Sequence, residues 1–149
     1  MFRLPKKALF AIEAVLDIAY HAGAEPVQSR EITRRQDIPR RYLEQALQQL
    51  TRDGILVGVR GPRGGYRLAR ERRRISIGDI VRVVQGVEAA EPDDMDGSEL
   101  GIKVVRPLWG ELQETLMARL DELSIDDLCD QADKAGVISE GRKALDFTI

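Results

Sequence analysis

Arginine side chains stand at the start of one predicted helix and in one predicted turn. Arg40 and Arg41 open a stretch, 39–52, that has the apolar spacing of a helix, and they are candidate phosphate contacts or groove probes. Its apolar face consists of Leu43, Ala46, Leu47 and Leu50. A shorter helix is expected over residues 29–35, with Ser29 as its N-cap. Two helices joined by a short turn, the second basic at its start, are typical of a helix-turn-helix, although many small bundles share this pattern.

A glycine-rich turn with two arginines follows. β-prone residues at 55–59 and 66–69 flank the segment RGPRGG (60–65), which predicts a hairpin with a basic tip, or wing. Glycine lets the backbone approach a phosphate closely, and arginine suits both phosphates and a narrow groove. We expect Arg63 and Arg67 to act in this way. The segment lacks the Lys-Ser/Thr pair of a P-loop, so nucleotide binding is not expected.

The two halves of the chain carry opposite charge. Residues 1–75 contain 16 Lys and Arg against 8 Asp and Glu, whereas residues 76–149 contain 7 against 17. A basic half suits a polyanion, and an acidic half does not. The split therefore favours two tasks on one chain; the alternative is a solvated surface with uneven charge.

The 149 residues give room for one domain with an attached dimerisation element. We expect a mainly α fold with a small β-hairpin: a winged helix-turn-helix domain at 1–86, an acidic loop at 87–106, dimerisation helices at 107–135, and a loosely ordered tail at 136–149. Further helices of the first domain are expected over 5–21 and 76–85.

An apolar stripe runs along the predicted helix 107–123. Its members are Leu108, Trp109, Leu112, Leu116 and Leu120. The stripe fits core packing against the N-terminal helix, or contact between two such helices in a homodimer. It is wider than an edge helix of a small domain needs, which favours a dimer interface combined with some core packing.

The residue inventory argues against several classes of protein. One cysteine and one histidine leave no intrachain disulfide, no cysteine-cluster metal site and no catalytic set, so we expect neither an enzyme nor a bound cofactor. No apolar run approaches the roughly 18 residues of a membrane span, and the N-terminus lacks a signal-peptide layout. The expectation is a cytoplasmic protein with no membrane contact.

Four segments together resemble the Rrf2-type bacterial transcription regulators. They are RYLEQALQQL (41–50), VRGPRGGYRLAR (59–70), ISIGDIVRVVQG (75–86) and LWGELQETL (108–116). The resemblance extends from Arg3 to about Leu128. It implies a homodimer of winged-helix domains, crossed by a long dimerisation helix, that regulates transcription by binding a partly palindromic site in double-stranded DNA.

The DNA contacts of that family carry over where the motif matches. Tyr42, Glu44 and Gln45 resemble its base-reading positions, and Arg60 resembles the wing arginine that enters the minor groove. Their chemistry agrees, since Gln can pair with adenine, Glu can accept from cytosine and Arg suits a narrow groove. The alternative for Tyr42 is a core residue at the start of the helix.

Many family members hold an iron–sulfur cluster on three cysteines before the dimerisation helix, and this sequence departs from that pattern. Residues 87–105 contain no cysteine, and the position of a nearby histidine in some members holds Arg106. We therefore expect no metal and an inert Cys129; the alternative is an iron–sulfur or redox sensor that uses unusual ligands or Cys129. The loop carboxylates Asp93, Asp94 and Asp96 are expected to be solvated rather than metal ligands.

The last four residues, Asp146, Phe147, Thr148 and Ile149, form an apolar end after an acidic segment. They are similar to the tail of serine acetyltransferases, whose terminal isoleucine enters the active site of cysteine synthase. Some Rrf2-type regulators of sulfur metabolism are likewise controlled by that enzyme. Cysteine synthase is thus a candidate partner; the alternative is that Phe147 and Ile149 fold back onto the domain.

Overall fold

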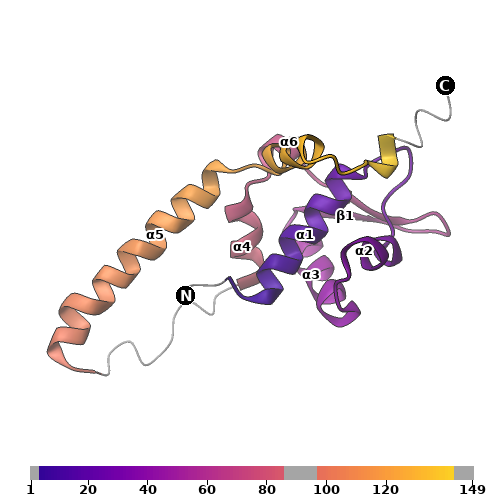
Figure 1. Cartoon of the computed structure of the whole chain (residues 1–149). Helices are drawn as coiled ribbons and strands as arrows, with labels where there is room; N and C mark the ends of the chain where they lie inside the picture. The colour runs from indigo at the N-terminus through magenta and orange to yellow at the C-terminus, as the bar shows by residue number, and fades with distance from the viewer. Residues whose placement is uncertain (1–3, 86–96, 143–149) are drawn as a thin grey trace.

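The computed structural model describes residues 4–85 and 97–142 of the chain (Figure 1). Its elements are α1 (Lys6–Tyr20), α2 (Ser29–Gln36), α3 (Arg40–Arg52), β1 (Leu56–Val59), β2 (Gly65–Leu68), the 3-10 turn η1 (Arg72–Arg74), α4 (Ile77–Gln85), the π-helical turn η3 (Gly101–Val105), α5 (Arg106–Glu122) and α6 (Ile125–Lys134). The expected class, mainly helical with one antiparallel hairpin, is confirmed. Among the helices of these two described ranges, none has the length and apolar character needed to cross a bilayer.

Helix α1 lies at the centre of the core and packs against α2, α3, α4 and α6. Ala8, Ala11 and Ala14 have no exposed surface, and their short side chains let the neighbouring helices approach closely. Large buried side chains fill the space around them: Ile18, Ile32, Leu43, Leu47, Leu50 and Ile80. The apolar face predicted for the stretch 39–52 is therefore the buried face of α3.

Helices α2 and α3 form the predicted helix-turn-helix. Asp37 makes the turn in the left-handed region, with φ of 53°, and Ile38 enters the core directly after it. The expected cap is wrong: the N-cap is Gln28, not Ser29. The Glu31 carboxylate reaches back and accepts a hydrogen bond from the Gln28 backbone N–H at 2.9 Å, which satisfies a free donor at the helix start.

The wing pairs β1 with β2 in an antiparallel register, and it is fastened to the loop before α2. Val27 and Tyr66 exchange two backbone hydrogen bonds, at 3.0 and 2.8 Å. A Cβ on Gly65 would lie 2.4 Å from the Val27 carbonyl oxygen, and one on Gly64 would lie 2.2 Å from that of Val59. The glycine pair is thus required to close the hairpin and dock it, a reason that is separate from any approach to phosphate.

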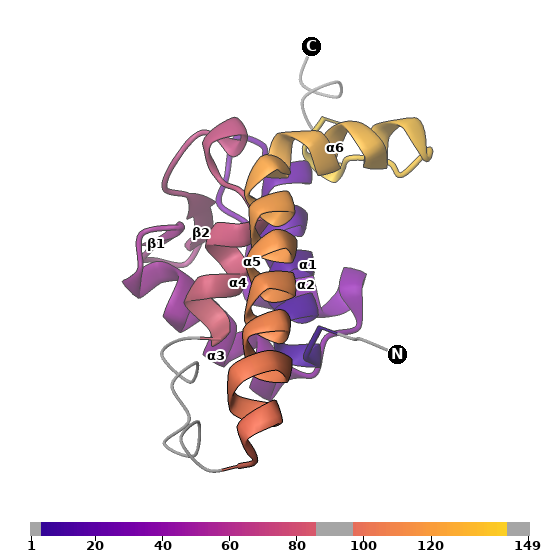
Figure 2. The same ribbon diagram turned by 90° about the vertical axis from the view of Figure 1, so that its left-hand side faces the viewer.

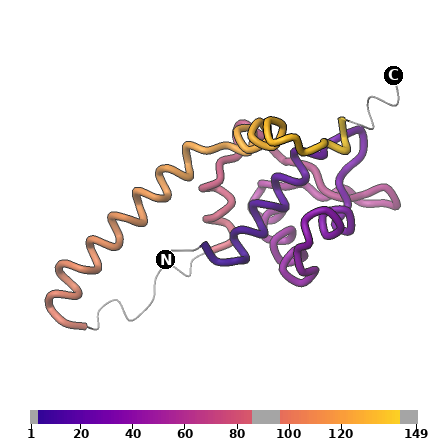
Figure 3. Tube along the Cα trace, in the orientation of Figure 1, coloured from indigo at the N-terminus to yellow at the C-terminus, as the bar shows by residue number. Residues whose placement is uncertain are grey.

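Helix α5 extends away from the body as an arm, joined at its C-terminal end (Figures 1 and 3). Backbone bonds from Ile77 N–H to the Leu123 carbonyl and from Ile125 N–H to the Ile75 carbonyl, both 2.8 Å, fix that end. Beside them, the Arg82 guanidinium donates two hydrogen bonds, of 2.7 and 2.6 Å, to the Asp121 carboxylate. The arm packs mainly on α4 rather than on the N-terminal helix. Figure 2 shows the arm from its outer side, in front of the rest of the protein.

The arm begins earlier than its sequence pattern predicts. Residues 99–105, expected to belong to the acidic loop, are helical, and they lead without a break into α5. Ser98 starts this turn, since its hydroxyl accepts from the Gly101 N–H at 3.1 Å and its carbonyl accepts from the Ile102 N–H at 2.9 Å. The rest of that loop through residue 96, including Asp93, Asp94 and Asp96, lies outside the described residues.

Helices α4 and α6 each begin with a serine cap, but the chain after α6 is not loose. Ser124 and Asp127 cap α6 reciprocally, and Ser76 and Asp79 do the same for α4. The segment 137–142, expected to be a loosely ordered tail, packs against the end of α1 through side-chain and backbone hydrogen bonds. Residues beyond 142 lie outside the described part of the chain.

The wing glycines yield a test. Gly65→Ala should lower the free energy of unfolding by about 1–3 kcal/mol, because the new Cβ must push the Val27 carbonyl out of its bridge. Urea denaturation measures this. Gly58→Ala is the matched control, since a Cβ there meets no atom within 4 Å. Equal losses in the two variants would contradict the steric argument.

Candidate nucleic-acid interface

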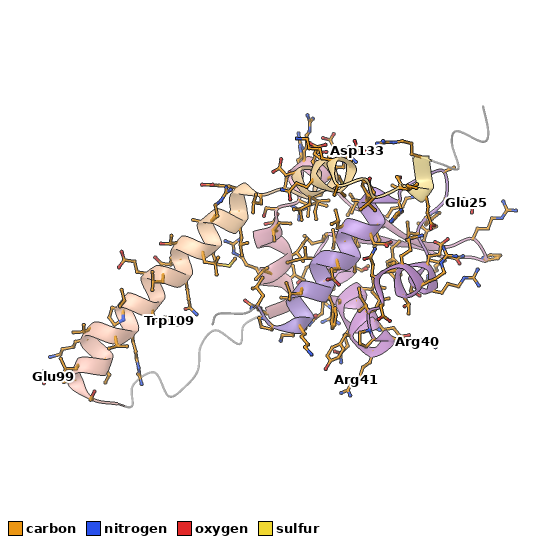
Figure 4. All side chains as sticks on the ribbon, in the orientation of Figure 1. Glu25, Arg40, Arg41, Glu99, Trp109 and Asp133 are labelled. Carbon is orange, nitrogen blue, oxygen red and sulfur yellow. The ribbon has the colours of Figure 1, made fainter. Side chains whose placement is uncertain are left out.

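The start of α3 presents a row of solvent-exposed polar side chains. The predicted contacts on this helix are all exposed: Arg40, Arg41, Tyr42, Glu44 and Gln45. The buried face of α3 lies on the other side of the same turns, so these side chains carry little of the packing. Figure 4 shows Arg40 and Arg41 directed away from the body of the protein.

Tyr42 combines exposure with support. Its side chain is 44% exposed, and its ring centroid lies 5.7 Å from that of Phe10 on α1, with the planes tilted by 40°. The alternative of a core residue at this position is therefore wrong. One face of the ring is held by α1, which leaves the rest of the side chain available to a ligand.

Glu44 is paired within its own helix. Its carboxylate accepts from Arg40 Nε at 3.0 Å, one turn away, and both side chains are more than half exposed. Exposed pairs of this kind contribute only about 0.3–0.5 kcal/mol. The pair presents both charges at the surface and can open at little cost when a base or phosphate competes for either partner.

The wing arginines divide into two groups. Arg60 and Arg63 stand exposed at the turn, and Arg63 makes a 3.4 Å ion pair with Glu25 between two largely exposed side chains. Arg67 lies at the base, where its guanidinium donates to the Ala24 carbonyl at 2.7 Å and to the Gly23 carbonyl at 3.4 Å. Arg67 thus has a role in the fold that the sequence did not indicate, and phosphate contact by Arg67 stays a prediction.

A buried ionic cluster lies beneath α2, and no local sequence pattern predicts it. The Asp17 carboxylate, whose side chain has no exposed surface, accepts two hydrogen bonds from Arg35, at 2.9 and 2.8 Å, and one from Gln36 at 2.8 Å. Hydrogen bonding to Asp17 raises the pKa of the Arg35 guanidinium above its usual value. The available signal was a carboxylate inside the apolar stretch AVLDIAY (14–20).

The single histidine and the single cysteine are both buried. His21 Nδ1 accepts from the Glu140 backbone N–H at 3.0 Å, and burial lowers the pKa of the imidazole. Cys129 is 3% exposed, and burial raises the pKa of its thiol, which disfavours the reactive thiolate. Within residues 4–85 and 97–142, no three groups of the metal-ligating kind lie together.

The fold and this surface define a winged helix-turn-helix protein with a polar recognition helix and a basic wing. A family model described as "Rrf2: Iron-dependent Transcriptional regulator" matches residues 4–131. The chain therefore belongs to the Rrf2 family of transcription regulators, whose members are DNA-binding regulators rather than enzymes.

Individual relatives agree with this assignment. The chain is 34% identical over 128 residues to the HTH-type transcriptional regulator IscR of Xenorhabdus nematophila, a match that covers 85% of this chain and 78% of that protein. The solved structure of T. potens IscR superposes with a TM-score of 0.75 at 32% identity and covers 93% of both chains. CymR, the global cysteine regulator of B. subtilis, gives a TM-score of 0.70 at 26% identity over 88% of this chain and 98% of its own.

The donor set of this chain does not fit the three-cysteine cluster that its family implies. The stretch 87–105 has no cysteine. Cys129 lies on α6, where it is buried and near the guanidinium of Arg72. Iron–sulfur clusters are usually held by four cysteine thiolates, and this chain has one cysteine. We therefore assign no step of its function to an iron–sulfur group.

Proposed function

We propose that this protein is a homodimeric transcription repressor that recognises a partly palindromic operator with α3 and the wing. The observation that carries the proposal is the exposure of Tyr42, Glu44 and Gln45 on the face of α3 opposite the core, beside an exposed basic turn. Such a helix fits the major groove, where amide and carboxylate side chains discriminate base edges.

The contacts divide by chemistry. Tyr42, Glu44 and Gln45 read base edges, while Arg60 enters the minor groove, where a narrow groove concentrates negative potential. Three further exposed arginines of α3 and the wing, Arg40, Arg41 and Arg63, bind phosphates and fix the register of the protein on the duplex. Among the described residues after 75, most acidic side chains belong to α5 and α6, and α5 extends away from the wing (Figure 1).

The wing contact has a direct test. Arg60→Ala should weaken binding to the operator, selected from genomic fragments, by about 1–3 kcal/mol, because a groove contact is lost. Fluorescence anisotropy over a salt series measures the affinity. Arg73→Ala removes another exposed arginine, from η1, which packs against α6, and should change binding little. Undiminished affinity after removal of both the Arg60 and Tyr42 side chains would contradict the assignment.

The arm supplies the dimer interface in this proposal. Leu108, Leu112 and Leu116 are 54%, 51% and 52% exposed, and Trp109 is 42% exposed. Large apolar side chains in such a continuous stripe mark an interaction surface on a soluble domain. Leu120 differs, since it is partly buried and packs against the core at the fixed end of the arm.

Charge placed in the stripe should separate the subunits. Leu112→Glu with Leu116→Glu should yield monomers in sedimentation velocity, because burying two unpaired carboxylates in an apolar contact is unfavourable. Ala118→Glu adds one such carboxylate to an exposed site on the opposite side of α5 and should leave the dimer intact. A wild-type dimer in the double variant would show that another surface mediates association.

We further propose that the regulatory signal arrives through cysteine synthase, captured by Asp146, Phe147, Thr148 and Ile149. Two observations support this: the likeness to CymR, described as a global cysteine regulator, and a donor set that does not fit a cluster. A terminal carboxylate can occupy an amino-acid carboxylate site, while isoleucine fills a side-chain pocket. These four residues lie outside the described structure.

Calorimetric titration with purified cysteine synthase tests this partner. The full chain should bind, binding should be lost on deletion of Ile149, and O-acetylserine should compete, because it occupies the same site. Thr148→Ser is the control for a change in the tail that keeps the terminal residue. No binding by the full chain, or binding that ignores both the deletion and the competitor, would refute the partner.

A further inference from the structure

The loop 21–27, between α1 and α2, is held from the side of the wing. Arg67 of β2 donates to the carbonyls of Gly23 and Ala24, at 3.4 and 2.7 Å. Val27 exchanges backbone hydrogen bonds with Tyr66 of the same strand, at 3.0 and 2.8 Å. The position of the wing on the body therefore depends on the position of this loop.

The same loop and the end of α1 are held from the opposite direction by the segment 137–142. Ser139 Oγ donates to the Tyr20 carbonyl at 2.7 Å, and the Tyr20 hydroxyl donates to the Val137 carbonyl. The Glu140 N–H donates to His21 Nδ1 at 3.0 Å. These bonds join parts of the chain that are more than 115 residues apart in sequence.

Gly141 makes this contact possible. A Cβ there would lie 2.0 Å from the Ala22 carbonyl oxygen, and a Cβ on Gly23 would lie 3.3 Å from the Gly141 Cα. The two backbones thus touch directly, with no room for a side chain between them. Gly141 itself is buried although it lies close to the end of the described chain.

The segment also reaches the helix-turn-helix. Glu140 accepts from Arg35 at 2.7 Å and from Arg34 at 3.2 Å, both on α2. Arg35 at the same time donates to the buried Asp17. One short segment is therefore bonded to α2 directly and to the wing through the loop 21–27.

We propose that residues 137–142 form a regulatory latch, which holds the wing in its DNA-binding position when docked and lowers DNA affinity when displaced. The route runs from Gly141 through the Ala22–Ala24 backbone to Arg67 and then to β2. The docked segment restrains the loop 21–27, and the hydrogen bonds of this loop hold the wing in place. When the segment undocks, the wing stays attached to a loop that is more mobile. The inference rests on DNA binding by α3 and the wing, and its first readout needs no DNA.

Hydrogen exchange with Gly141→Val tests the route, since valine clashes with the Ala22 backbone while every DNA-facing residue is retained. Amides of Val27 and Tyr66 should exchange faster, while those of the α3 core turns should keep their protection. DNA affinity should fall about 5- to 50-fold. Ile138→Ser is the matched control, because Ile138 belongs to the same segment but is 72% exposed.

A double-mutant cycle separates a relay from a general loss of stability. If the signal passes through Arg67, then Gly141→Val should weaken DNA binding far less in an Arg67→Ala background than in the wild type. Ser139→Ala with Glu140→Gln offers a milder displacement if Gly141→Val does not fold. Unchanged exchange at Val27 and Tyr66 in a folded variant, or additive effects in the cycle, would overturn the latch. If the wild type binds no DNA while Gly141→Val still speeds exchange at Val27 and Tyr66, the proposed function alone is refuted.

Discussion

The buried carboxylate of Asp17 fixes the helix-turn-helix on the rest of the domain. Burying a charge is unfavourable unless donors replace its water, and here Arg35 and Gln36 supply three hydrogen bonds from the last turn of α2. The paired geometry of a guanidinium on a carboxylate sets direction as well as distance. Helix α2 is thereby oriented on α1, and α3 follows through a short turn in which Asp37 has a left-handed backbone conformation.

Two projecting elements depend on this body at opposite ends. The wing extends from the side of α2, and the arm α5 extends from the end of α4, as Figure 1 shows. Each is fastened by a few bonds near its base: Arg67 and the Val27–Tyr66 bridge for the wing, Arg82 with Asp121 for the arm. The proposed DNA and subunit contacts thus occupy separate surfaces that share α1 and α4 as a rigid core.

Short-range patterns explain what the sequence could predict. The apolar spacing of α3 and the glycine-rich turn of the wing act within one element, so helix, hairpin and exposed polar face were all foreseeable. The start of the arm was not foreseeable in this way. Ser98 caps a helical turn within a stretch whose acidic residues and glycines predict a loop. The position of the N-cap likewise depends on the hydrogen bond that the Glu31 carboxylate accepts from the Gln28 N–H, since both Gln28 and Ser29 are polar residues at this helix start.

The ion pairs between residues far apart in the chain could not be predicted from the sequence for a different reason. Arg35 lies 18 residues from Asp17 and 105 from Glu140, and no local pattern selects these partners among the other charges. The buried position of Asp17 was marked only by its apolar neighbours. The expectation of a loosely ordered tail at 136–149 is wrong for the residues around Gly141. The close approach of Gly141 to the Ala22 carbonyl follows from tertiary packing, which composition does not reveal.

The separation of the two faces of α3 has a consequence for how such regulators diversify. Glu44 and Gln45 are exposed, whereas Leu43 and Leu47 carry the packing, so substitutions on the outer face leave the core intact. Gly64 and Gly65 are sterically required by the hairpin, while Arg60 and Arg63 beside them are exposed and carry none of the core packing. Under the proposed mode of operator binding, new operator preferences can therefore arise by single substitutions that leave the scaffold folded, without a compensating change elsewhere.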